Sequence, residues 1–189
     1  MATTKPKQIP KNQESRLTNN HSTPNGEKSL KTAIASLPWL QDLDEDQVNA
    51  LTRISRSKNV GAGEYLFHQG DKEDYLYILL DGRVAIEVDV PGRESLVLYQ
   101  AEPIDLIGWS SVTPVIRERT ASARSLLPSK LIALDSVKLR QLCDEDHHLG
   151  YTIMRRLAHV IATRLLITRM ELTELLSGIP DQVDNPSSA

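Results

Sequence analysis

Hydrophobic and polar positions divide the chain into two helical segments with a segment of short strands between them. Residues 31–58 carry apolar side chains at helical spacing, and Asp44 can cap the second of the expected helices. Residues 60–134 show short apolar runs separated by Gly, Pro and Asp turn signals, a pattern typical of a sandwich or barrel. The runs expected to form strands are 65–67, 75–80, 84–90, 96–99 and 131–134.

A single long helix is predicted from His147 to Ser177, because this stretch has no Pro and one Gly. Its apolar side chains occupy more than one face, and such a helix needs two partners. We expect one face to lie on the barrel and the other to pair with a second copy, giving a homodimer. The alternative is burial of the whole helix within its own monomer.

Both ends of the chain have the composition of flexible tails. Residues 1–30 are poor in apolar side chains and carry five Lys and Arg against two Glu, a net charge of +3. Residues 178–189 are rich in Pro, Ser and Asp. We therefore expect one domain at 31–177, with N-terminal helices at 31–58, the barrel at 60–134, and a hinge and long helix at 136–177.

Composition excludes several classes of protein. The 189 residues, 40% of them hydrophobic and 25% charged, suffice for one packed domain. No run of about eighteen apolar residues predicts a membrane span, and no apolar core near the start predicts a secretory signal, so we expect a cytoplasmic protein. A net charge of −3 and 4% aromatic residues argue against a nucleic-acid-coating protein.

The chain lacks the residue patterns of common enzymes. No nucleophile elbow, zinc-protease helix, P-loop or dinucleotide-binding glycine motif occurs. His68 is alone on its predicted strand, so no histidine pair is placed for a metal. The one cysteine, Cys143, is either a redox-sensing thiol activated by Arg140 or, as we favour, a small hydrophobe. We predict no catalytic residue, metal site or cofactor, and hence no enzyme.

Residues 104–125 carry the most distinctive chemistry. A glycine and small polar residues precede a cluster of arginines. Glycine permits close backbone approach, and free amides near a short helical turn attract anions. Arg119 and Thr120 add a guanidinium and a hydroxyl. Together these features predict a phosphate cradle.

Over residues 36–177 the chain resembles the cyclic nucleotide-binding domain of catabolite activator proteins and kinase regulatory subunits. Three segments in order carry the resemblance: a glycine-punctuated stretch, the I-G-W-S to E-R-T-A cassette, and the L-D-S-V-K-L-R-Q-L stretch before the last helix. The resemblance implies an α+β, mainly β, fold. Its centre is a double-stranded β-helix, or jelly-roll, barrel with N-terminal helices and a long C-terminal helix. The segments are 60–86 with Gly63, Gly70 and Gly82, 107–121, and 134–142.

The same resemblance implies roles for individual residues. Arg119 matches the arginine that pairs with the cyclic phosphate, and Thr120 the neighbouring hydroxyl. Gly108 matches the glycine whose backbone approaches the ribose, and Ala121 ends the cassette. Thr168 on the long helix matches the polar residue that reads the purine edge.

Trp109 departs from the family pattern. It stands where the family has an acidic residue that accepts a hydrogen bond from the ribose 2′-hydroxyl, and an indole can only donate. Ser110 or Ser111 could supply the missing acceptor, or Arg119 could bind a different anionic ligand. Alternatively, Trp109 could fill the pocket, or its ring could stack on a base.

We therefore predict a stand-alone regulatory sensor for a cyclic nucleotide, cAMP- or cGMP-like, or a related phosphorylated ligand. The residues after Ser177 are too few for the helix-turn-helix of activator proteins, so we expect no direct DNA binding. The signal would pass through the C-terminal helix to an unidentified partner protein. The alternative is a degenerate, ligand-free domain that acts as a docking or dimerisation scaffold.

Overall fold

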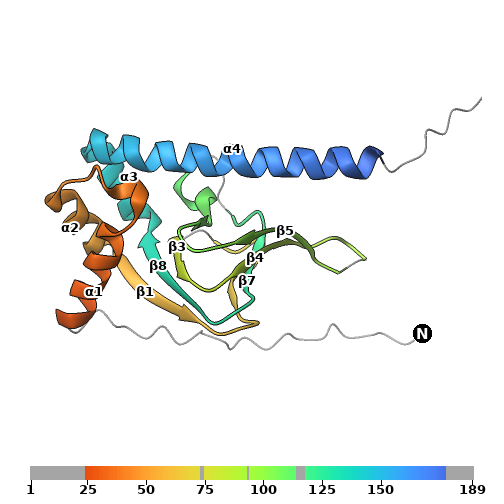
Figure 1. Cartoon of the computed structure of the whole chain (residues 1–189), viewed down its shortest axis with the longest axis horizontal. Helices are drawn as coiled ribbons and strands as arrows, with labels where there is room; N and C mark the ends of the chain where they lie inside the picture. The colour runs from red at the N-terminus through yellow and green to blue at the C-terminus, as the bar shows by residue number, and fades with distance from the viewer. Residues whose placement is uncertain (1–23, 73–74, 93, 114–117, 178–189) are drawn as a thin grey trace, which may run out of the picture.

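The computed structural model describes residues 24–72, 75–92, 94–113 and 118–177 (Figure 1). The predicted tail residues 1–23 and 178–189 lie outside the described part. The helices are α1 (Pro24–Ala35), η2 (Pro38–Leu40), α2 (Glu45–Arg53), η3 (Trp109–Val112), α3 (Ser136–Glu145) and α4 (His147–Ser177). The strands are β1 (Ser55–Val60), β2 (Tyr65–Phe67), β3 (Tyr75–Asp81), β4 (Val84–Val88), β5 (Leu96–Ala101), β6 (Leu106–Ile107), β7 (Ser122–Ser125) and β8 (Ser129–Asp135).

The strands form the predicted jelly-roll barrel from two four-stranded antiparallel sheets. One sheet has the order β1-β8-β3-β6 and the other β2-β7-β4-β5. Figure 1 shows α4 lying along the barrel, with α1, α2 and α3 gathered near its N-terminal end. The mixed fold with a mainly β centre, N-terminal helices and a long C-terminal helix is confirmed.

Two boundaries at the N-terminal side differ from the prediction. The first helix begins at Pro24, so residues 24–30 belong to the helical layer. Proline suits the first turn of a helix, and Leu30 and Ile34 then lie on one buried face. The helical pattern expected up to residue 58 also ends early, because Ser55–Val60 pairs with β8 as a strand.

The start of α2 is confirmed where the sequence predicted it. The Asp44 side chain accepts a hydrogen bond from the Gln47 backbone N–H at 2.8 Å, and the Gln47 side chain accepts from the Asp44 N–H at 3.1 Å. This reciprocal capping box satisfies two backbone donors at the exposed helix start. It fixes the entry into the helix that leads to β1.

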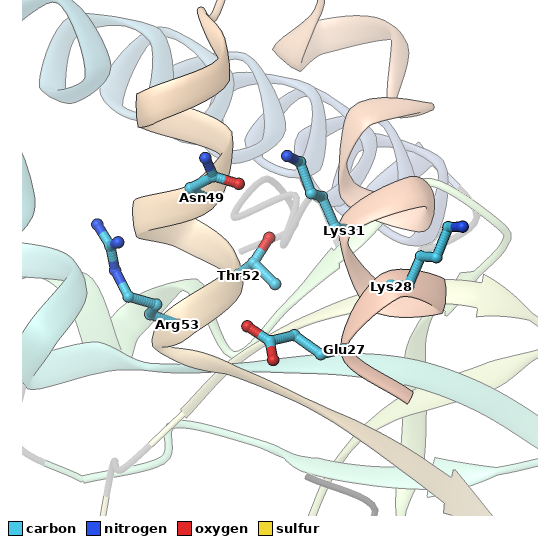
Figure 2. Close-up of a pocket in the computed structure, with 6 residues that line it drawn as sticks. All are labelled: Glu27, Lys28, Lys31, Asn49, Thr52 and Arg53. Carbon is cyan, nitrogen blue, oxygen red and sulfur yellow. The ribbon is translucent and has the colours of Figure 1, made fainter. Parts of the chain in front are cut away.

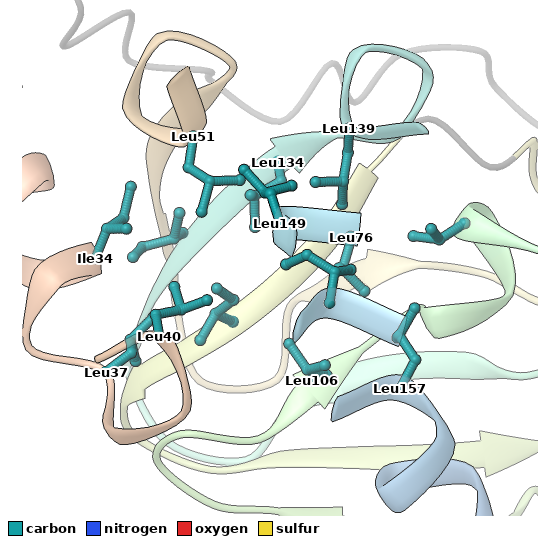
Figure 3. Packing of buried hydrophobic residues seen from close by; sticks show 14 of the residues in the cluster. Ile34, Leu37, Leu40, Leu51, Leu76, Leu106, Leu134, Leu139, Leu149 and Leu157 are labelled. Atoms are coloured by element: carbon teal, nitrogen blue, oxygen red, sulfur yellow. The ribbon is translucent and has the colours of Figure 1, made fainter. Parts of the chain in front are cut away.

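Two hydrophobic clusters share strands β3 and β8. The helix-side cluster includes Leu76 and Ile78 of β3 and packs them against the helices (Figure 3). The barrel-side cluster includes Tyr77 and Leu79 from the opposite face of the same strand. Strand alternation explains the division, because successive side chains point to opposite faces. The sheet therefore separates the barrel interior from the helical layer.

Only the first half of α4 is buried in the monomer. Leu149, Ile153, Leu157 and Val160 belong to the helix-side cluster. Beyond them four large apolar side chains are exposed among the described residues, and Met170 is 64% exposed. The other exposed apolar side chains in the second half are Leu165, Leu166 and Leu172. The prediction that the whole helix is buried within its own monomer is therefore wrong.

Among the described residues, no helix is long and apolar enough to cross a membrane.

Candidate functional site

The predicted cassette begins where β6 ends. Gly108 adopts φ +76°, a left-handed conformation, and starts the short helix η3. A side chain is disfavoured there by the backbone angle, and its Cβ would also collide with Nη1 of Arg119. The glycine thus allows the chain to turn while the arginine lies directly against its backbone.

Arg119 lies at the centre of the site. Its side chain is buried, with 4% of the residue exposed. Nη1 donates to the Gly108 carbonyl at 3.0 Å, and Nη2 donates to the Tyr75 carbonyl at 2.6 Å. The guanidinium carbon lies 4.1 Å from the centre of the Phe67 ring. The structure therefore brings together Gly108 and Arg119, the two residues to which the resemblance gave the ribose and phosphate roles.

The backbone of Arg119 is held by the turn before β3. Its N–H donates to the Asp71 carbonyl at 2.8 Å, and its carbonyl accepts from the Gly70 N–H, also at 2.8 Å. Gly70 has φ +85° in this turn. The glycine-punctuated segment and the cassette, recognised separately in the sequence, are thus parts of one hydrogen-bonded unit.

The serines of the cassette connect it to α3. The Ser111 hydroxyl donates to the Gly108 carbonyl at 2.8 Å and accepts from the Ser136 hydroxyl at 2.7 Å. Arg140 donates from Nη1 to the Ser111 carbonyl at 2.5 Å. Ser110 and Ser111 are both buried. These contacts favour a role for Ser111 in coupling the cassette to α3 over a role as a substitute ribose acceptor.

The remaining predicted site residues are more scattered. Trp109 is half-buried and packs against the helix-side cluster, which argues against an indole that fills the barrel interior. Thr120 is exposed and Ala121 half-buried, directly after Arg119. Thr168 is exposed on α4, and its purine-reading role stays a prediction.

Arg124 and Cys143 lie in surroundings that do not indicate a ligand site. The Arg124 guanidinium pairs with the buried Glu87 carboxylate in the neighbouring strand. Burial raises the pKa of the Cys143 thiol to about 11, and the charges of Asp144 and Asp146 add to the shift. This direction is opposite to the lowered pKa that the redox-sensing interpretation of Cys143 requires, and it favours the interpretation as a small hydrophobe. Arg117 of the same arginine cluster lies outside the described residues.

Two cations of β1 were not predicted as part of the site. The Arg56 guanidinium carbon lies 4.0 Å from the centre of the Tyr75 ring, and Lys58 Nζ lies 5.7 Å from that of Tyr77. The sequence contains a signal for them in the alternation Ser-Arg-Ser-Lys-Asn-Val. That signal was obscured because these residues were assigned to the end of a helical segment.

A pocket of about 370 Å³ lies elsewhere, between α1 and α2 (Figure 2). Its lining mixes charges of both signs, and Lys31 already pairs with Glu45 at 2.7 Å. None of the predicted cassette residues lines it. Among the described residues no group of three His, Cys, Asp or Glu side chains is placed to hold a metal ion. The pocket is lined by Glu27, Lys28, Lys31, Asn49, Thr52 and Arg53.

Comparison with known sequences points to one family. Residues 57–146 match the cyclic nucleotide-binding domain. The chain is 28% identical over 145 residues to a CRP-like cAMP-activated global transcriptional regulator of Mycobacterium tuberculosis. That match covers 76% of this chain and 62% of the regulator. The chain thus spans less than two thirds of the length of this curated relative.

Solved structures share the fold. A cyclic nucleotide-binding domain from Methylobacillus flagellatus aligns with a TM-score of 0.65 at 20% identity, covering 83% of this chain and 86% of that one. The c-di-GMP responsive global regulator of Xanthomonas campestris aligns with a TM-score of 0.64 at 19% identity. The second alignment covers 70% of this chain and 65% of the regulator. At these identities the likeness concerns the architecture alone.

Proposed function

Through residues 57–146 the chain carries a domain of the cyclic nucleotide-binding family, and from that premise we propose that it is a non-catalytic regulatory sensor. Its ligand is a cyclic nucleotide or a related phosphorylated molecule, held by Arg119 and the backbone of the cassette. The sensor acts in the cytoplasm as a homodimer and passes its signal through α4 to a partner protein.

The observation that carries this proposal is the buried guanidinium of Arg119 beside the Gly108 carbonyl, at 3.0 Å. An arginine whose guanidinium donates to two carbonyl oxygens already presents its N–H groups in an orientation that suits the oxygens of a phosphate. The name of a related protein supports the ligand class, because the mycobacterial relative is called cAMP-activated.

The signal is proposed to arise from competition for Arg119. In this structure the Gly108 and Tyr75 carbonyls accept its hydrogen bonds. A phosphate would take over some of these donors and shift the cassette backbone. Ser111 would transmit that shift to Ser136 and Arg140 of α3, which precedes α4. The ligand therefore selects one placement of the helices, provided that it binds this placement more tightly.

A ligand-free scaffold is the second candidate function, and the same arginine favours it. Two carbonyls already accept hydrogen bonds from the Arg119 side chain. A buried cation satisfied in this way can serve packing alone. Under this candidate the fold would present a constitutive docking surface.

Ligand-dependent thermal stabilisation distinguishes the two candidates. We expect one of cyclic AMP, cyclic GMP, cyclic dinucleotides or linear nucleotides to raise the melting temperature by several degrees. A ligand at a hundred times its dissociation constant adds about 2.7 kcal/mol of stability. Arg119→Ala should abolish the shift, whereas Arg83→Ala, which removes an exposed guanidinium paired with Glu102, should retain it.

Arg119→Lys serves as the second variant, because the truncation to Ala leaves the Gly108 and Tyr75 carbonyls without their donor. The lysine keeps the charge but cannot bridge both carbonyls. A folded Arg119→Lys protein that binds as tightly as the wild type would contradict the cassette assignment. Absence of any shift with the wild type would favour the scaffold.

A further inference from the structure

Arg56 and Lys58 point into the barrel. Arg56 lies directly opposite Ala133 of β8, and Lys58 lies opposite Leu131. Directly opposed residues of antiparallel strands share a face of the sheet. Ala133 and Leu131 both belong to the barrel-side cluster. The two cations therefore extend from the inner face, where apolar side chains are the rule.

These cations meet Arg119 on a continuous surface of aromatic rings. The Arg56 guanidinium lies over Tyr75, and the Arg119 guanidinium lies over Phe67. The Tyr77 ring lies between them, 6.2 Å from the Tyr75 ring and 6.0 Å from the Phe67 ring. We call the three cations Arg56, Lys58 and Arg119, together with the rings of Phe67, Tyr75 and Tyr77, the cationic shelf.

The positive charge of the cationic shelf is poorly compensated on the β1 side. Neither Arg56 nor Lys58 has an ion pair within 4 Å in the described part of the chain. Nε of Arg56 is buried and has no hydrogen-bond partner among those residues. Burial, followed by the neighbouring Arg56 charge, lowers the pKa of Lys58, while the Glu64 carboxylate opposes this only in part.

Cations held close together at a partly buried surface are unfavourable unless an anion joins them. Stacking on aromatic rings offsets part of this cost and leaves the N–H edges of a guanidinium available to a ligand. A ligand with a single cyclic phosphate would contact Arg119 and would leave the cations of β1, Arg56 and Lys58, without an anion. The shelf thus has more positive charge than a mononucleotide requires.

We propose that Arg56 and Lys58 bind a second phosphate, so that the ligand of this site is a nucleotide with two phosphate groups. This inference rests on the proposed sensor function and narrows its ligand class. Arg119 holds one phosphate and the β1 cations hold the other.

Isothermal titration calorimetry with defined probes tests the proposal. Cyclic di-GMP, cyclic di-AMP and adenosine 3′,5′-bisphosphate carry two phosphate groups, and cyclic AMP and cyclic GMP carry one. We expect a two-phosphate probe to bind the wild type more tightly than either single-phosphate probe. Which of the three binds distinguishes a cyclic dinucleotide from a bisphosphorylated mononucleoside.

Charge-removing variants of β1 provide the specific readout. Arg56→Gln and Lys58→Met should each weaken the two-phosphate probe about tenfold, the loss expected for one charge-assisted hydrogen bond. Binding of cyclic AMP should change by less than about twofold, because Arg119 is intact. Lys130→Met is the matched control, since Lys130 is exposed on the adjacent strand β8 and alternates with the inward-facing Leu131. Arg56→Lys, which retains the charge, should keep most of the affinity and covers the case in which Arg56→Gln does not fold.

The failure of this inference is distinguishable from failure of the sensor function. Tight binding of cyclic AMP or cyclic GMP that depends on Arg119, with no preference for two phosphates and no effect of the β1 variants, would overturn the two-phosphate ligand alone. If none of the five probes binds the folded wild type, the two-phosphate ligand is wrong, and the thermal-shift screen with linear nucleotides decides whether the sensor function fails as well.

Discussion

Gly108 shows how much of the site depends on one backbone conformation. We expect Gly108→Ala to lower the free energy of unfolding by about 2–3 kcal/mol. The left-handed angle alone costs a non-glycine residue about 1 kcal/mol, and the added collision with Arg119 increases the loss. Urea unfolding followed by circular dichroism measures the change.

Gly63→Ala is the matched control for this prediction. Gly63 has φ +81°, close to the angle at Gly108, but no atom lies within 4 Å of the position that a Cβ would occupy there. This variant should therefore show the conformational cost without the collision. Equal losses at both glycines would mean that Arg119 moves away at little cost and does not depend on Gly108.

Individual site residues were predictable only where a local motif carries them. Gly108 and Arg119 were identified because their spacing within the cassette resembles that of a family. The link from Ser111 to Ser136 joins residues 25 positions apart, and neither side chain has a distinctive chemistry. The placement of Trp109 on the helix side depends on the direction in which η3 leaves Gly108, which composition does not specify.

At the scale of elements, α4 contacts the barrel through hydrogen bonds in addition to its buried apolar side chains. Arg164 donates from Nη2 to the Leu106 carbonyl at 2.7 Å, and its guanidinium carbon lies 4.7 Å from the centre of the Tyr99 ring. Arg156 donates to the Ile104 carbonyl at 3.2 Å, two turns earlier. Both acceptors belong to the segment that leads directly into Gly108. The helix and the cassette are therefore connected from this side as well.

We expect Arg164→Met to loosen this connection. The variant leaves the Leu106 carbonyl without its charged donor, a loss of about 1–3 kcal/mol in local stability. Amide hydrogen exchange should become at least about tenfold faster in residues 160–168 of α4. Arg169→Met, which removes an exposed arginine of the same helix, should leave the exchange unchanged. Unaltered protection in Arg164→Met would show that the apolar contacts alone hold the helix.

Elements with apolar periodicity were predictable, and those without it were not. The bounds of α4 agree with the sequence, as do the apolar strands β2 and β3. Strands β1 and β7 are composed mainly of polar residues, Ser-Arg-Ser-Lys-Asn-Val and Ser-Ala-Arg-Ser. Their strand conformation depends on pairing with β8 and β4, and without an apolar run the alternation in β1 was not interpreted as a strand.

At the scale of the whole molecule, the second half of α4 leaves large apolar side chains uncovered. Leu166 and Met170 are 60% and 64% exposed and lie one helical turn apart. Leu165 and Leu172 are also exposed and are separated by seven residues, the spacing of a two-helix seam. A second copy of α4 would cover this stripe.

We therefore expect a dimer at micromolar concentration in sedimentation velocity experiments. Leu166→Glu should weaken the dimer at least about tenfold, because it places a charge in the seam. Asn59→Glu adds the same charge to an exposed polar position of β1, outside α4, and should have a smaller effect. A wild-type protein that sediments as a monomer at high micromolar concentration would show that the stripe has another occupant.

The division of β3 and β8 between two hydrophobic clusters has a consequence for how the protein unfolds. Removal of the helical layer exposes Leu76, Ile78 and Ile132, and opening of the barrel exposes Tyr77 and Leu79 from the same pair of strands. If either the helical layer or the barrel opens, one face of β3 and β8 is exposed to water, and the packing of the other part on these strands is weakened. The domain should therefore melt in one cooperative transition, and in the native state the amides of β3 and β8 should be those best protected from hydrogen exchange.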